Sequence, residues 1–126
     1  MARYLLDSDI LIEWLRSNEP IVTWLETRDA AGDYLACTPV SVAEIYAGLR
    51  PHERFVINDL LGILHCVDID ERIGRKAGHY RQTFGASHGV EIADALIAAT
   101  AHALGLTLCS RNLRHYPMRD LKKQRL

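Results

Sequence analysis

Short apolar stretches alternate with longer stretches of helical periodicity along this chain of 126 residues. The short stretches are bounded by charged or turn-forming residues and predict four strands, at 3–7, 33–38, 65–69 and 106–110. The first of them hardly alternates between apolar and polar positions, which is typical of a strand buried in a parallel sheet. Between the strands, the periodicity predicts helices at about 8–16, 18–30, 38–48, 51–64, 70–84 and 92–104.

Capping and turn residues mark the ends of these predicted elements. Asp7 or Ser8 can cap the first helix, and Thr38-Pro39 can open the third. Gly105 ends the last helix, whereas residues 85–89 predict a loop. Strands that alternate with helices predict an α/β fold with a mainly parallel sheet. Since no repeat or linker interrupts the pattern, we expect residues 1–126 to form a single domain.

The composition is that of an ordinary soluble globular protein, with 48% apolar and 25% charged residues. No apolar run approaches the ~20 residues that span a bilayer, and the N-terminus lacks the pattern of a secretory signal. The three cysteines, Cys37, Cys66 and Cys109, are scattered along apolar stretches. They predict buried small side chains rather than a disulfide framework, and the cytoplasm is the expected compartment.

Charge is distributed unevenly, although the net charge is only −1. Six of the 15 basic residues but only one of the 16 acidic residues lie from Arg111 onward. An acidic body with a basic C-terminal segment is compatible with a nucleic-acid partner. A solvated terminal segment explains the same distribution equally well.

Three acidic residues stand in strongly apolar stretches, namely Asp7, Glu44 and Asp94. A carboxylate is costly to bury unless it is paired, hydrogen-bonded or bound to a metal ion. Each of the three lies near a strand end or a helix start, and such positions gather at one edge of a parallel sheet. Hard oxygen ligands favour Mg²⁺ or Mn²⁺, and carboxylates that hold these ions are a common device for phosphodiester hydrolysis.

Each acid also has an explanation without a metal ion. Asp7 can be a helix cap, Glu44 can form a capping box with Ser41, and Asp94 can interact with the dipole of the last helix. Asp9 fits a solvated acid in a first helical turn. Taken together, three acids at matching element ends favour a metal site over these separate explanations.

Four segments in fixed order carry a resemblance to a known family. They are 5–12 (LLDSDILI), 42–48 (VAEIYAG), 92–101 (IADALIAATA) and 108–116 (LCSRNLRHY). The chain thereby resembles the PIN-domain ribonucleases, and most closely the VapC toxins of bacterial toxin–antitoxin pairs. The order and spacing of the motifs agree over nearly the whole chain.

The resemblance implies a PIN-like α/β/α sandwich with a mainly parallel central sheet. It implies an Mg²⁺- or Mn²⁺-dependent endoribonuclease in which Asp7, Glu44 and Asp94 are catalytic metal ligands. Ser8 and Ser110 would be supporting hydroxyls, with Asp9 as an outer acid. Partners would be an RNA substrate, a second copy in a homodimer and a cognate antitoxin whose C-terminal segment covers the active site.

One position departs from many members of the family, which carry Asp where this chain has Asn112. Three carboxylates should hold a second metal ion more weakly than four, which leaves one or two metal ions as alternatives. Asn112 carries no charge and is expected to position water or substrate. Glu91 is a candidate fourth acid or a solvated cap. The basic residues Arg111 and Arg114, together with His115, are expected to contact RNA or antitoxin. The neutral Asn112 also supports an alternative, a weak or inactive PIN-like module that binds RNA or protein.

Overall fold

Five strands form one sheet in the computed structural model, which describes residues 1–126. The strand order is β3-β2-β1-β4-β5, and every neighbouring pair is parallel. The strands are β1 (Arg3–Leu6), β2 (Tyr34–Cys37), β3 (His65–Cys66), β4 (Thr107–Ser110) and β5 (Lys123–Arg125). The parallel sheet predicted from the sequence is confirmed, with one more strand than expected.

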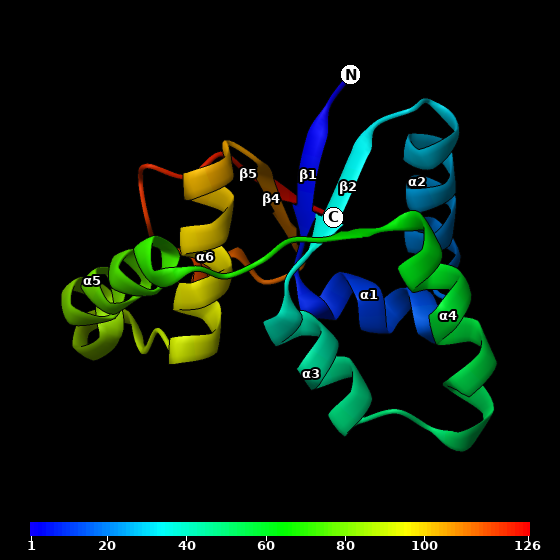
Figure 1. Cartoon of the computed structure of the whole chain (residues 1–126), viewed down its shortest axis with the longest axis horizontal. Coiled ribbons are helices and arrows are strands. Elements are labelled where there is room, and N and C mark those ends of the chain that lie inside the picture. The colour runs from blue at the N-terminus through cyan, green and yellow to red at the C-terminus, as the bar shows by residue number, and fades with distance from the viewer.

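Helices cover both faces of this sheet, which confirms the α/β/α sandwich. The group α1–α4 lies on one side and the pair α5–α6 on the other (Figure 1). The helices are α1 (Ser8–Leu15), α2 (Glu19–Ala30), α3 (Pro39–Ala47), α4 (Arg54–Ile63), α5 (Glu71–His88) and α6 (Ile92–Leu104), with short 3-10 turns at Pro51–Glu53 and Leu113–His115. None of these helices is both long enough and apolar enough to cross a membrane.

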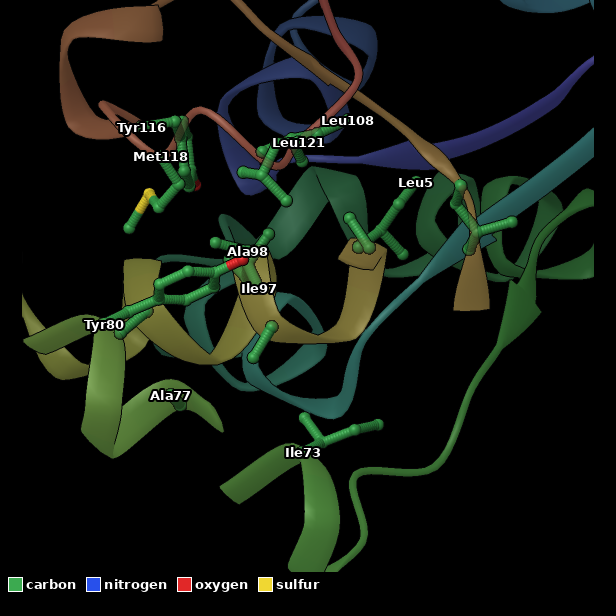
Figure 2. Packing of buried hydrophobic residues seen from close by; sticks show 14 of the residues in the cluster. Leu5, Ile73, Ala77, Tyr80, Ile97, Ala98, Leu108, Tyr116, Met118 and Leu121 are labelled. Carbon is green, nitrogen blue, oxygen red and sulfur yellow. The ribbon is translucent and has the colours of Figure 1, made fainter. Parts of the chain in front are cut away.

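Two hydrophobic clusters fill the spaces between the sheet and its helical layers. Successive residues of a strand point to opposite faces, so Leu5 contributes to one cluster and Leu6 to the other. The first cluster joins Leu5 and Leu108 to α5, α6 and the C-terminal segment (Figure 2). Because both faces of β1 are buried, its sequence is apolar without alternation, as a central parallel strand requires.

The strand order creates a topological switch point between β1 and β4. From β1 the chain moves outward through β2 to β3, and then crosses back to β4 on the other side of β1. Connections between parallel strands are right-handed. When the direction in which strands are added to the sheet reverses, the connecting helices therefore change face, which places α1–α4 on one face and α5–α6 on the other. The carboxyl ends of β1 and β4 therefore border the crevice in which open α/β sheets bind ligands. Figure 1 shows the beginnings of α1, α3 and α6 together at this edge.

Some local predictions were wrong. Residues 85–88 continue α5, which ends at the left-handed Gly89, so the expected loop is shorter. The C-terminal segment contains β5, because backbone pairing with β4 outweighs the poor strand preference of Lys123-Gln124-Arg125. Phe55 in α4 is 85% exposed, whereas Ile57 and Leu60 form the buried face of that helix. Cys66 is exposed because β3 is a two-residue edge strand, whereas the other two cysteines are buried as predicted.

Asp120 fastens the C-terminal segment to the α5–α6 layer. Its carboxylate accepts hydrogen bonds from the Tyr80 hydroxyl at 2.7 Å and from Lys76 Nζ at 3.0 Å, and His102 Nε2 lies 3.3 Å away. Burial alone would raise the pKa of Asp120. The hydrogen bonds and the positive charges of Lys76 and His102 outweigh burial and lower that pKa.

We expect the Asp120→Asn substitution to lower the free energy of unfolding at pH 7 by on the order of 1 kcal/mol, because Lys76 loses its charged partner. A lowered folded-state pKa means that this stabilisation is complete above the unfolded carboxyl pKa of about 3.9 and is lost as the pH falls through the folded value. Urea unfolding at a series of pH values should therefore show the two proteins converging in acid. The exposed pair Glu71–Arg75 provides the control, since Glu71→Gln should change stability very little.

Candidate active site

Asp7 occupies the switch point and is held by groups from β4 and from the start of α1. Its backbone N–H donates to the Cys109 carbonyl at 2.9 Å, which continues the β1–β4 pairing. Its side chain accepts from the Ser8 N–H at 2.8 Å, as a helix cap, and from the Ser110 hydroxyl at 2.8 Å. Asp7 is only 6% exposed, so these contacts fix the carboxylate at the end of the sheet. The capping role and a role in a site are therefore compatible.

Glu44 comes to the same edge on α3. The Ser8 hydroxyl donates to Glu44 Oε1 at 2.7 Å and lies 3.0 Å from the Ser41 hydroxyl. The cap of α3 is Thr38, whose side-chain oxygen accepts from the Ser41 N–H, so the predicted capping box of Ser41 and Glu44 does not form. Glu44 is exposed, in contrast to the buried position that its apolar neighbours suggested.

Asp94 lies in the first turn of α6 and faces the other two acids. Burial raises the pKa of Asp94, and the negative charges of Asp7 and Glu44 raise it further. His115 opposes this rise, with Nδ1 at 3.6 Å from Asp94 Oδ2, and the Tyr116 hydroxyl also opposes it. The negative charges of Asp7 and Glu44 thus reach Asp94 across the edge of the sheet from two other elements.

Asp9 is part of this cluster rather than a solvated acid. Its Oδ2 accepts from the Arg111 N–H at 3.0 Å and lies 3.3 Å from the Ser110 hydroxyl. Burial and the charge of Asp7 raise the pKa of Asp9. Its second oxygen, Oδ1, is buried and has no hydrogen-bond partner among the protein groups. An unpaired buried carboxylate oxygen is costly, so this position favours an additional positive or hydrogen-bonding group.

The segment after β4 places Asn112 and its neighbours at the rim. Asn112 Nδ2 lies 3.1 Å from His115 Nε2, and Arg114 Nε lies 3.4 Å from Asn112 Oδ1. Arg111 forms an ion pair with Glu13 at 3.2 Å, so its guanidinium is already partnered. Arg114 and His115 are exposed, and His115 lies beside Asp94.

Glu91 does not join the acids. Its side chain is 76% exposed and lies 3.9 Å from the guanidinium of Arg81 on α5. As the cap residue of α6 it precedes the first turn, whereas Asp94 within that turn faces the sheet edge. Of the two alternatives for Glu91, the structure agrees with the solvated cap, because Glu91 precedes the first turn of α6 and its side chain does not share the direction of Asp94.

Tyr116 is a site residue that the sequence analysis missed. Its side chain is fully buried among the hydrophobic residues of the α5–α6 layer, and its hydroxyl lies 3.5 Å from Asp94 Oδ1. Burial and the nearby charges of Asp7 and Asp94 raise the pKa of its phenol, so it remains a hydrogen-bond donor. Tyr116 ends the motif segment 108–116, but its local sequence does not predict this contact, because the fold alone brings its hydroxyl to Asp94.

The donor set fits a hard divalent cation. It consists of carboxylate and hydroxyl oxygens, and the mutual repulsion of the acids, together with the orphaned Asp9 oxygen, would be relieved by positive charge. No three His, Cys, Asp or Glu side chains are positioned as a ready-made metal cage. An ion at this edge would therefore also take water or substrate oxygens, as Mg²⁺ commonly does.

The fold and the site define a class, the doubly wound α/β proteins with an acidic site at the switch point of a parallel sheet. Residues 4–121 match the PIN domain. The chain therefore belongs to the PIN domain family.

Individual relatives agree with this assignment. The chain is 37% identical over 115 residues to Ribonuclease VapC10 of Mycobacterium tuberculosis strain H37Rv, covering 90% of this chain and 86% of that protein. The fold matches VapBC2 from Rickettsia felis bound to a promoter DNA fragment, with a TM-score of 0.83, 19% identity and 98% of each chain covered. It also matches DNA-bound VapBC from Salmonella typhimurium, with a TM-score of 0.81, 22% identity and coverage of 99% and 98%.

We expect the Tyr116→Phe substitution to raise the pKa of Asp94 further in the metal-free protein. The phenol donates to the carboxylate and thereby favours its charged form, so removing the donor favours the protonated form. Carboxyl-detected NMR titration measures the midpoint directly. Tyr34 is the first residue of β2 and lies at the amino ends of the strands, opposite the acids. Tyr34→Phe should therefore leave the midpoint of the Asp94 titration unchanged. An Asp94 midpoint in Tyr116→Phe at or below the wild-type value would show that the hydroxyl does not support the carboxylate.

Proposed function

We propose that this protein is an Mg²⁺- or Mn²⁺-dependent endoribonuclease and the toxin of a toxin–antitoxin pair. The observation that carries the proposal is the convergence of Asp7, Glu44 and Asp94 at the switch point of a PIN-domain sheet. The name of the related VapC10 protein, a ribonuclease, supports RNA as the substrate. We place this activity in the cytoplasm, as the scattered cysteines suggest.

Asp7, Glu44 and Asp94, together with water or substrate oxygens, would hold the metal ion, which would supply positive charge for the phosphate and lower the pKa of a bound water. The residues around them maintain the geometry. Ser110 holds Asp7 and Ser8 holds Glu44, each through a hydroxyl that donates to the carboxylate. Such hydrogen bonds fix the direction of the remaining carboxylate oxygens.

Exposed side chains of the segment after β4 would contact RNA. His115 lies beside Asp94, and Arg114 contacts Asn112 at the rim of the site, so both could approach a phosphate bound near the acids. Asn112, which is hydrogen-bonded to both, would orient water or substrate without adding charge. Arg111 contributes less directly, because it is paired with Glu13.

A cognate antitoxin is the second partner that we propose. The solved VapBC structures that share this fold are complexes of the toxin–antitoxin type. A C-terminal antitoxin segment would cover the acids and exclude RNA, and its polar groups would meet Arg114 and His115. Assembly into a homodimer stays a prediction from the resemblance to VapC toxins.

We expect purified, antitoxin-free protein to cleave RNA when Mg²⁺ or Mn²⁺ is added and to lose activity when the metal is chelated. Asp94→Asn should reduce the rate at least about 100-fold, because it removes a ligand charge from the site. Glu91→Gln is the matched control, since this acid on the same helix is exposed and outside the cluster. Equal cleavage by Asp94→Asn, or cleavage without a divalent ion, would contradict the proposed mechanism.

A binding module without catalysis is the second candidate, and Asn112 is the observation that favours it. We expect calorimetric titration with Mn²⁺ to show binding to the wild-type protein, and Asn112→Asp to add or strengthen a second binding event, because a fourth carboxylate adds ligand charge. Absence of Mn²⁺ binding at millimolar concentration would support the module. Binding without a second event in Asn112→Asp would show that residue 112 lies outside the reach of the metal.

A further inference from the structure

Three cysteines share one row across the sheet. Cys37 on β2 is the register partner of Cys66 on β3, and Cys109 on β4 is the register partner of Leu6 on β1. The β1–β2 register pairs Leu5 with Ala36, so Leu6 lies next to Cys37 in the same row. The order across the sheet is therefore Cys66, Cys37, Leu6 and Cys109, and only the first two are direct neighbours.

The spacing of the row permits one disulfide and excludes the others. Adjacent strands lie about 4.8 Å apart, which falls within the range of Cα separations found in disulfides, about 4.4–6.8 Å. Cys109 is two strand spacings, or about 9.6 Å, from Cys37, which is too far for a bridge. Side chains of register partners leave the same face of the sheet. Because β3 is a two-residue edge strand, it has few pairing hydrogen bonds to resist the small approach that a bridge requires.

The two thiols differ in accessibility. Cys66 is exposed, whereas Cys37 is fully buried in the cluster beneath α1 and α4. Burial, together with the adjacent Cys66, raises the pKa of the Cys37 thiol to about 12. Cys37 is therefore mainly protonated and shielded from solvent at neutral pH, so a reagent from solvent meets Cys66 first, and Cys37 can react only with a group beside it such as Cys66.

We propose that Cys66 and Cys37 form an oxidisable thiol pair that a hydroperoxide converts into an intramolecular disulfide. The Cys66 sulfur forms a bond to a peroxide oxygen, the O–O bond breaks, and the departing oxygen leaves as water or alcohol with the thiol proton. The Cys37 sulfur then bonds to the Cys66 sulfur, the S–O bond breaks, and the hydroxyl leaves as water with the Cys37 proton. Two sulfurs each lose one electron, and the peroxide gains both.

The bridge would join the two ends of the segment that carries α3 and α4. This segment includes Ser41 and Glu44, so oxidation would tie the α3 side of the acidic site to the edge of the sheet. The pair lies outside the acid cluster, and the proposal is independent of whether the protein cleaves RNA.

The test is to treat the full chain with hydrogen peroxide, block free thiols with an alkylating agent in denaturant, and analyse intact and digested protein by mass spectrometry. The expected product has lost two hydrogens, carries a single alkyl group on Cys109 and yields a cross-linked peptide pair containing Cys37 and Cys66. Dithiothreitol should restore three alkylatable thiols.

Two variants control the assignment. Cys109→Ala should form the same cross-link, whereas Cys66→Ser, at an exposed position that tolerates the change, should form none and keep two free thiols. The proposal is overturned if peroxide leaves all three thiols free, oxidises Cys66 to a sulfinic acid while Cys37 stays free, or produces only links between separate chains.

Discussion

The hydrogen bond from the Ser110 hydroxyl to the Asp7 carboxylate joins the two strands between which the sheet reverses its direction of growth. It exists because β1 and β4 pair in parallel and end at the same edge. The same pairing sets the start of α1 and hence the position of Ser8, whose hydroxyl reaches Glu44 on α3. Side chains that are far apart in the sequence therefore meet through the backbone pairing of one central strand.

This arrangement brings several carboxylates together around Asp7, where little water can reach the charge. Asp7 is almost fully buried, and burial together with the charge of Asp7 raises the pKa of Asp9 and of Asp94, so the uncompensated site costs stability. Hydroxyl donors limit that cost without neutralising the charge, and Tyr116 does so from within the hydrophobic layer. Positive charge at this position would relieve the remaining cost.

The two outer strands, β3 and β5, are short, but the segments that carry them place important side chains. The C-terminal segment that ends in β5 delivers Tyr116 to the acids and Asp120 to α5 and α6, so it supports the site and the fold together. At the other edge, β3 has only two residues, yet its register places Cys66 beside Cys37. In each case, strand pairing between segments far apart in the sequence sets the position of residues whose local sequence does not predict it.

The sequence by itself determined the alternation of strands and helices, the parallel sheet and the candidate acids, because burial on both faces of β1 and the caps of the helices leave local patterns. Only the tertiary structure decided which acids meet, since Glu91 and Asp94 share a helix start but only Asp94 faces Asp7. It also decided that Lys123-Gln124-Arg125 is a strand and that Tyr116 reaches the site. These features depend on pairing and packing between distant segments, which no local periodicity encodes.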